Sequence, residues 1–121
     1  AQQTLDDWPC IVGIDSELSQ ELMHGDSVLF TEMLQLFVSE NAGAGEDIKA
    51  LLDAGEYALA AKRAHKVGGQ AGTLGATELQ QLALNLEQAL RLRVEGIEDK
   101  LSAFQECFRI LQNSIKNSQL A

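Results

Sequence analysis

Hydrophobic positions recur every three or four residues over most of this chain, which is the spacing of one buried face on a helix. The longest such stripe runs from Ile97 to Ile115, and similar stripes cover residues 29–52, 60–74 and 79–90. Runs of β-branched residues are absent, and Pro9 is the one proline of the chain. Strands are usually rich in β-branched residues, and helices usually lack proline in their interior. The pattern therefore predicts an all-α protein.

Glycines and capping residues divide these stripes into separate helices. The expected helices cover approximately residues 15–24, 26–55, 56–73, 77–95 and 97–116. The second is predicted to be one long helix, bent near Gly43 and Gly45, because the hydrophobic phase continues across these glycines. Thr77 followed by Gln80 resembles a capping box at the start of the fourth.

The short connections between these helices predict antiparallel neighbours. The expected fold is an antiparallel up-and-down four-helix bundle with an additional N-terminal helix. Residues 13–116 would form the bundle, residues 1–12 a lead-in segment and residues 117–121 a polar tail. Trp8, Ile11 and Val12 are expected to pack the lead-in against the bundle. The lead-in and the polar tail also fit the expectation of a C-terminal domain excised from a longer chain.

Composition narrows the possible functions. The formal net charge of −9 is unfavourable for binding nucleic acid or an anionic membrane surface. Cys10 and Cys107 lie far apart without metal-ligand spacing, so we expect two reduced thiols and no metal site. A carboxylate di-iron bundle needs two Glu-x-x-His motifs, and the chain does not contain two. No apolar stretch is long enough for a transmembrane helix.

His65 is the candidate for chemistry. On a helical wheel at about 100° per residue it lies roughly 140° from the centre of the hydrophobic stripe of its helix, so its ring should face solvent. Gly68, Gly69 and Gly72 follow it, and three glycines inside a helix cost about 3 kcal/mol relative to alanine. Glycine at such positions commonly permits close approach of another molecule, here expected on the His65 side.

A histidine ring suits phosphoryl chemistry. Near pH 7 a neutral ring presents a nitrogen lone pair that can attack phosphorus and form a phosphoramidate. A ring exposed on a rigid helix is well placed for in-line transfer, which depends mainly on positioning and charge neutralisation. The residues after His65 form no phosphate-cradling loop, because they lie within the predicted helix.

The stretch around His65 resembles the signature of the histidine-containing phosphotransfer (HPt) family. The matching residues are Ala64, His65, Val67, Gly69, Leu74, Gly75 and Ala76. The similarity extends over residues 12–116, in the layout of the helices and in the Gly13-Ile14-Asp15 opening. It implies a phosphorelay carrier, of the kind found in hybrid two-component sensor kinases, that accepts a phosphoryl group from a receiver-domain aspartate and passes it to another receiver.

The resemblance also implies roles for individual residues. His65 would be the phosphorylated nucleophile, and the partner receiver would supply Mg²⁺, with no cofactor in this chain. Many family members carry Lys or Arg three residues after the histidine, where this chain has Gly68. Lys62, one helical turn before His65, could take its place, whereas Lys66 points further aside.

We expect the receiver to dock over the His65 face. The candidate phosphoryl surroundings and docking residues are Lys62, Lys66, Gly68, Gly69 and Gly72, aided by Leu84. Gln70 turns away from His65 on the wheel, and Glu87 on the next helix has no assigned role. The protein is expected to be a cytoplasmic monomer, or the C-terminal domain of a membrane-anchored sensor kinase. A non-catalytic helical interaction module is the alternative function.

Overall fold

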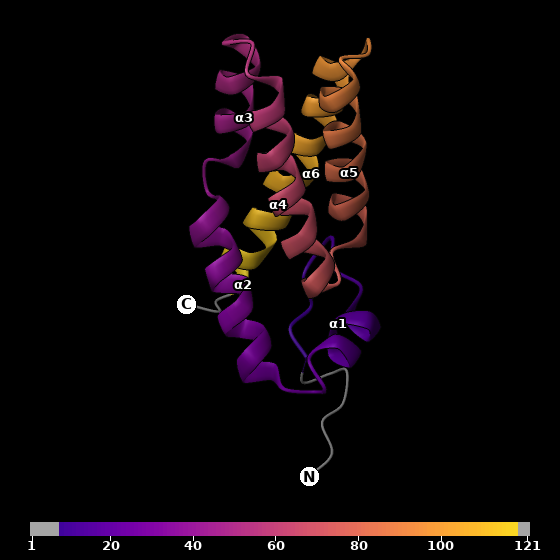
Figure 1. Cartoon of the computed structure of the whole chain (residues 1–121). Coiled ribbons are helices and arrows are strands. Elements are labelled where there is room, and N and C mark those ends of the chain that lie inside the picture. Colours follow the sequence, from indigo (N-terminus) through magenta and orange to yellow (C-terminus); the bar gives the residue numbers. More distant parts are fainter. Residues whose placement is uncertain (1–7, 119–121) are drawn as a thin grey trace.

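The computed structural model describes residues 8–118 and folds them into helices, with no strand in this range (Figure 1). The helices are α1 (Ser16–Leu22), α2 (Ser27–Asn41), α3 (Ala44–Asp53), α4 (Tyr57–Leu74), α5 (Thr77–Leu92) and α6 (Ile97–Asn117). The predicted all-α class is therefore confirmed.

The helix α4 is central to the arrangement. It packs along α5 and also contacts α1, α2 and α3, while α6 lies behind it in the view of Figure 1. The successive helices α4, α5 and α6 alternate in direction, and α2 with α3 forms the fourth arm of the bundle (Figure 1). Together with α1 at one end, this confirms the antiparallel four-helix bundle with an additional N-terminal helix.

Small residues form the core face of α4. The predicted stripe of Ala60, Ala64, Val67, Ala71 and Leu74 is buried, and Ala61 and Gly68 are buried beside it. The larger side chains come from other helices, including Phe30, Phe37, Phe104 and Phe108. Because alanines project little from the helix, the neighbouring helices approach the α4 backbone closely. Leu29, which the hydrophobic pattern placed in the core, is instead exposed.

The expected single helix over residues 26–55 is wrong, because α2 ends at Asn41 and α3 begins at Ala44. Asn41 is fully buried, and its side-chain amide donates to the carbonyl of Phe37 and to Oε1 of Gln70. Arg63 of α4 donates to Oδ1 of Asn41 at 2.8 Å and to the backbone carbonyl of Glu40 at 3.3 Å. These bonds stabilise the interruption, because they satisfy a carbonyl close to the C-terminal end of α2.

Part of the lead-in segment packs against the bundle. Trp8 is buried, stacks on Phe30 with ring centroids 4.8 Å apart, and donates from its indole nitrogen to Oγ of Ser19 at 2.9 Å. Ile11 is also buried, whereas Val12 is exposed. Residues 1–7 of the lead-in and 119–121 of the polar tail lie outside the described residues.

The helix caps agree only in part with the sequence-based expectation. Asp15 and Asp26 cap α1 and α2 through hydrogen bonds from backbone N–H groups three residues later. The predicted capping box of Thr77 and Gln80 is wrong, because Ala76 is the N-cap residue and makes no side-chain bond. The Gln80 side chain instead lies against Gly72 of α4.

The cysteines, possible metal ligands and helix lengths of residues 8–118 bear on the functions considered above. Cys10 and Cys107 are free thiols. Within this part of the chain, no group of three histidine, cysteine or acidic side chains could hold a metal ion. No helix described here combines the length and apolar character needed to cross a membrane.

Removing the Arg63 side chain should destabilise the protein, because Asn41 would lose a donor to its buried carbonyl oxygen. We expect Arg63→Ala to lower the free energy of unfolding by about 1–3 kcal/mol, the cost of an unsatisfied buried polar group. Urea denaturation followed by circular dichroism measures this. Lys62→Ala, an exposed neighbour, is the control and should change stability by less than about 0.5 kcal/mol. Equal stability of the two variants would contradict a structural role for Arg63.

Candidate functional site

His65 lies in the middle of α4, on the side opposite the buried stripe. Its side chain is 71% exposed, although its neighbours Ala64 and Val67 are fully buried. The helical period therefore separates a core face from a face that carries the imidazole into solvent. The structure places the ring where the wheel predicted it, accessible to another molecule.

One nitrogen of this ring is bound by a carboxylate. Nδ1 of His65 lies 3.0 Å from Oε1 of Glu87 on α5. Burial tends to raise the pKa of Glu87, but hydrogen bonds from His65 and Arg91 and their charges outweigh it, so the pKa is lowered. Because an ionised carboxylate only accepts hydrogen bonds, Nδ1 carries a proton. In the neutral ring Nε2 then holds the lone pair.

Arg91 completes this arrangement from the next turn of α5. Its Nε donates to Oε2 of Glu87 at 3.0 Å, so the two carboxylate oxygens bind two different partners. Neither residue was predicted to belong to the site: Glu87 had no assigned role, and Arg91 was not among the candidates. A usable signal was present, because a glutamate four residues before an arginine forms an ion pair on a helix.

A shallow groove between α4 and α5 lies beside the ring. It encloses about 150 Å³ and is lined by Ala64, His65, Gly68, Gly69, Gln80, Leu84 and Glu87. Leu84 is 43% exposed and gives the groove an apolar wall, as the predicted docking role requires. The site thus combines a nucleophilic ring, a carboxylate and a small apolar surface.

The three glycines have different surroundings. A Cβ at Gly69 would meet nothing within 4 Å, so this glycine leaves the outer face open. A Cβ at Gly68 would lie 3.2 Å from Cβ of Ala83, and one at Gly72 would collide with the Gln80 side chain. Gly68 therefore allows close packing of α5, although it also lines the groove beside His65. Gly72 lies against the exposed side chain of Gln80, and a docking role for these two glycines stays a prediction.

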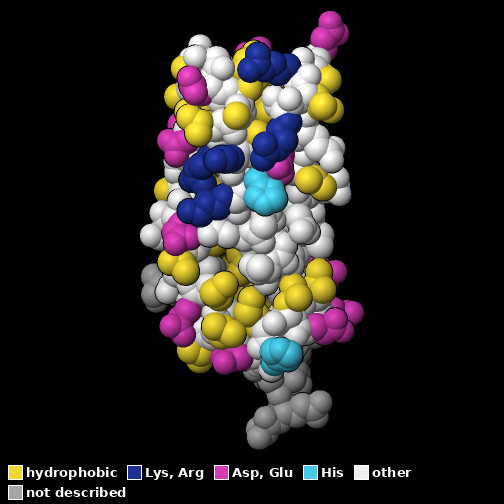
Figure 2. All heavy atoms as spheres, in the orientation of Figure 1, with side chains coloured by type: hydrophobic (Ala, Val, Ile, Leu, Met, Phe, Trp, Pro, Cys, Tyr) yellow, Lys and Arg dark blue, Asp and Glu magenta, His cyan; other side chains and the backbone are white. Residues whose placement is uncertain are grey.

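Basic side chains are concentrated on α4 and at the end of α5. Of the nine Lys and Arg residues of the chain, five lie on α4 or at the end of α5, namely Lys62, Arg63, Lys66, Arg91 and Arg93. Figure 2 shows Lys and Arg side chains over the upper half of this face and hydrophobic side chains over its lower half. The helix α4 contains no acidic residue, so its face is positive although the whole chain is strongly negative.

Lys62 and Lys66 are both exposed on α4. Neither forms a hydrogen bond or ion pair with the side chains that the structure describes, so both ammonium groups are available to a ligand. Substitution by Lys62 for the basic residue absent at position 68 stays a prediction.

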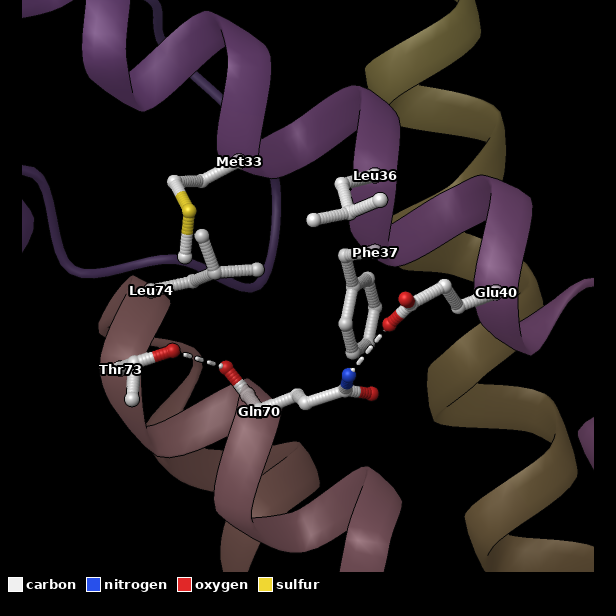
Figure 3. Close-up of a pocket in the computed structure, with 7 residues that line it drawn as sticks. All are labelled: Met33, Leu36, Phe37, Glu40, Gln70, Thr73 and Leu74. Carbon is white, nitrogen blue, oxygen red and sulfur yellow. Dashed lines mark hydrogen bonds between the residues drawn. The ribbon is translucent and has the colours of Figure 1, made fainter.

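A second groove lies between α2 and α4 (Figure 3). Met33, Leu36, Phe37 and Leu74 form its apolar part, and Glu40, Gln70 and Thr73 border it. Gln70 donates to Oε1 of Glu40 at 2.7 Å, as the dashed line in Figure 3 shows. Gln70 is thus directed toward α2 and away from His65, in agreement with the helical wheel.

Comparison with protein families identifies the class to which this bundle and its exposed histidine belong. The family model described as "Hpt domain" matches residues 32–119, which is most of the chain. The chain belongs to the Hpt domain family and is a histidine-containing phosphotransfer module of two-component signalling. Domains of this family interact with receiver domains. Comparisons with curated proteins and with solved structures gave no match.

The different surroundings of two adjacent glycines lead to a stability test. Gly69→Ala should raise the free energy of unfolding by about 0.5–1 kcal/mol, because alanine is the better helix former and the space is open. Gly68→Ala should instead lower it by about 1 kcal/mol, because the new methyl group would press against Ala83. Chemical denaturation of both variants measures this, and equal stabilisation would contradict tight packing at Gly68.

Proposed function

We propose that this domain accepts a phosphoryl group on Nε2 of His65 from a receiver-domain aspartyl phosphate and passes it to the aspartate of another receiver. The observation that carries this proposal is the orientation of the ring. Its side chain is 71% exposed, and Glu87 binds Nδ1 at 3.0 Å. The nitrogen left free is therefore the one that a docked partner can reach.

The bond changes of the first step follow from this tautomer. The Nε2 lone pair attacks phosphorus of the aspartyl phosphate, an N–P bond forms, the O–P bond breaks, and the aspartate leaves as a carboxylate. The ring keeps its Nδ1 proton and gains positive charge during the attack, which the Glu87 carboxylate stabilises. In the second step the carboxylate of another receiver attacks phosphorus, the N–P bond breaks, and the neutral ring is restored.

The face around His65 supports docking of a receiver domain. It offers the exposed side chain of Leu84 on one side of α4 and that of Leu36, beside the α2–α4 groove, on the other. Gly69 lies between them and has open space above it. The lysines on α4 suit a partner whose active site is acidic and carries a phosphoryl group. We infer that the receiver contacts both apolar edges and covers the ring.

The proposal assigns the remaining catalytic components to the partner. The receiver would hold Mg²⁺ and orient the phosphoryl group, while this chain provides the nucleophile, Glu87 and the surrounding positive charge. Lys62 is the proposed substitute for the basic residue absent at Gly68. We further propose a cytoplasmic monomer that acts beside its receivers, whether free or joined to a sensor kinase.

Phosphoryl transfer to His65 can be tested with a radiolabelled, phosphorylated receiver domain. The wild-type protein should gain label that is labile in acid and stable in alkali, and His65→Gln should abolish it. His24→Gln is the matched control, because it removes the other histidine of the chain and should keep full labelling. Label on His65→Gln would contradict the site, and absence of label on the wild-type protein with a range of receivers would favour a non-catalytic interaction module.

The docking face can be tested by adding bulk where the structure has open space. Gly69→Arg should slow phosphoryl acceptance at least tenfold, because the side chain would occupy the surface beside the ring. Ala103→Arg places the same side chain on an exposed position of α6 and should leave the rate unchanged. A time course of radiolabel transfer at a limiting receiver concentration measures the rate for both variants. Equal rates for the two variants would contradict docking over Gly69.

A further inference from the structure

The Glu87 carboxylate is shared between two helices. Its Oε1 binds His65 of α4 and its Oε2 binds Arg91 of α5, each at 3.0 Å. The side chain of Glu87 is 10% exposed, whereas those of its partners His65 and Arg91 are 71% and 48% exposed. An acidic side chain with so little access to water depends on its protein partners to satisfy its oxygens.

Arg91 affects this carboxylate in two ways. Its hydrogen bond to Oε2 restricts rotation of the carboxylate, which keeps Oε1 directed at Nδ1 of His65. Its positive charge also offsets part of the negative charge that the ring experiences. Without that offset, a carboxylate 3.0 Å away would favour the protonated imidazolium, which has no lone pair and cannot attack phosphorus.

We propose that Arg91 is a positioning residue for phosphoryl transfer. By holding Oε1 of Glu87 against Nδ1 of His65, it keeps the ring proton on Nδ1 and leaves Nε2 free. This inference rests on the proposed phosphorelay function. It differs from direct contact between Arg91 and the phosphoryl group, because the Nε of Arg91 is bound to the carboxylate oxygen that faces away from the ring.

The other charged groups near α4 do not replace Arg91. The charged side chains that contact α4 or belong to it include Glu40, Asp47, Lys62, Arg63, Lys66, Glu87, Arg91 and Arg93. Arg93 lies over the ring of Tyr57, at the start of α4. Glu40 and Asp47 interact with Gln70 and Arg63, which the helical period places on the opposite side of α4 from His65. Both lysines are exposed on α4, and neither binds Glu87. Among the basic residues near α4 that the structure describes, Arg91 is therefore the one that pairs with Glu87, whose carboxylate contacts the His65 ring.

A double-mutant cycle separates action through Glu87 from direct action. Arg91→Ala should slow phosphoryl acceptance by about threefold to fivefold, the fold-change that corresponds to a half-exposed ion pair. In a Glu87→Ala background the same substitution should have little further effect. If Arg91→Ala slows transfer by the same factor in both backgrounds, Arg91 acts directly on the phosphoryl group or the receiver, and the proposal is overturned.

The matched control is Lys49→Ala on α3. Lys49 forms an ion pair with Asp53 that has the same spacing of four residues but lies away from the site, so its removal should not change the rate. Circular dichroism confirms that each variant keeps its helices. Arg91→Lys tests the orientation separately, since it keeps the charge but lacks the Nε donor, and it should recover only part of the wild-type rate.

The pH profile and the ring tautomer provide readouts that a purely structural role would not move. Arg91→Ala should shift the profile of phosphoryl acceptance to higher pH, because the unbalanced carboxylate favours the protonated ring. Glu87→Gln should shift it to lower pH. An unchanged profile in Arg91→Ala would overturn the proposal.

Nitrogen-15 NMR of His65 in the free protein needs no receiver. At a pH where the ring is neutral, the wild-type protein should show the proton on Nδ1, and Arg91→Ala should show a mixture of the two tautomers. The same tautomer in both would contradict the positioning role. Wild-type protein that fails to accept phosphoryl groups, but shows the tautomer change in Arg91→Ala, would refute the phosphorelay and leave the positioning of the ring intact.

Discussion

Close packing between α4 and α5 is the constraint on which the site depends. Gly68 of α4 faces Ala83 of α5 so closely that an added Cβ would lie 3.2 Å from the alanine methyl group. Glu87 follows Ala83 by one helical turn, and this separation allows its short side chain to reach His65. With larger residues at this contact, the helices would stand further apart and the hydrogen bond would be lost. The small residues therefore position the carboxylate as well as the core.

The charge of the protein is distributed unevenly. The charges close to His65 affect an approaching group more than the net charge of the chain does. The chain has a formal net charge of −9, yet α4 carries Lys62, Arg63 and Lys66 and no acidic residue. The acidic group nearest the ring, Glu87, is paired with Arg91. The His65 ring thus lies beside positively charged side chains on an otherwise acidic molecule. Such a local positive charge attracts an anionic group more strongly than the rest of the protein surface does.

Much of the fold could be predicted from the sequence, because helical periodicity is a local property. The stripes of α4 and α6 and the exposure of His65 follow from spacing alone. The break between α2 and α3 was not predictable in this way, since it depends on Asn41 meeting Arg63 and Gln70 from a distant part of the chain. The hydrophobic phase continues across the break, so periodicity indicated one helix.

The site shows the same division. The wheel placed the ring correctly, but it could not show that Gly68 and Gly72 face α5 and that Gly69 alone of the three faces open space. The role of a glycine is decided by what lies opposite it, and that depends on the packing of a second helix. The pairing of Glu87 with His65 also joins residues 22 positions apart, beyond the reach of any local pattern. Only the spacing of Glu87 and Arg91 was visible in the sequence.

The polar network on the opposite side of α4 has a mechanical consequence. Hydrophobic contacts between alanines and their neighbours have little directional preference, so they would permit a helix to turn about its own axis. The hydrogen bonds of Arg63 and Gln70 to the end of α2 are directional, and they hold α4 from the side away from the ring. The direction in which α4 presents the imidazole to solvent is therefore fixed by amide and guanidinium groups on the other side of the helix.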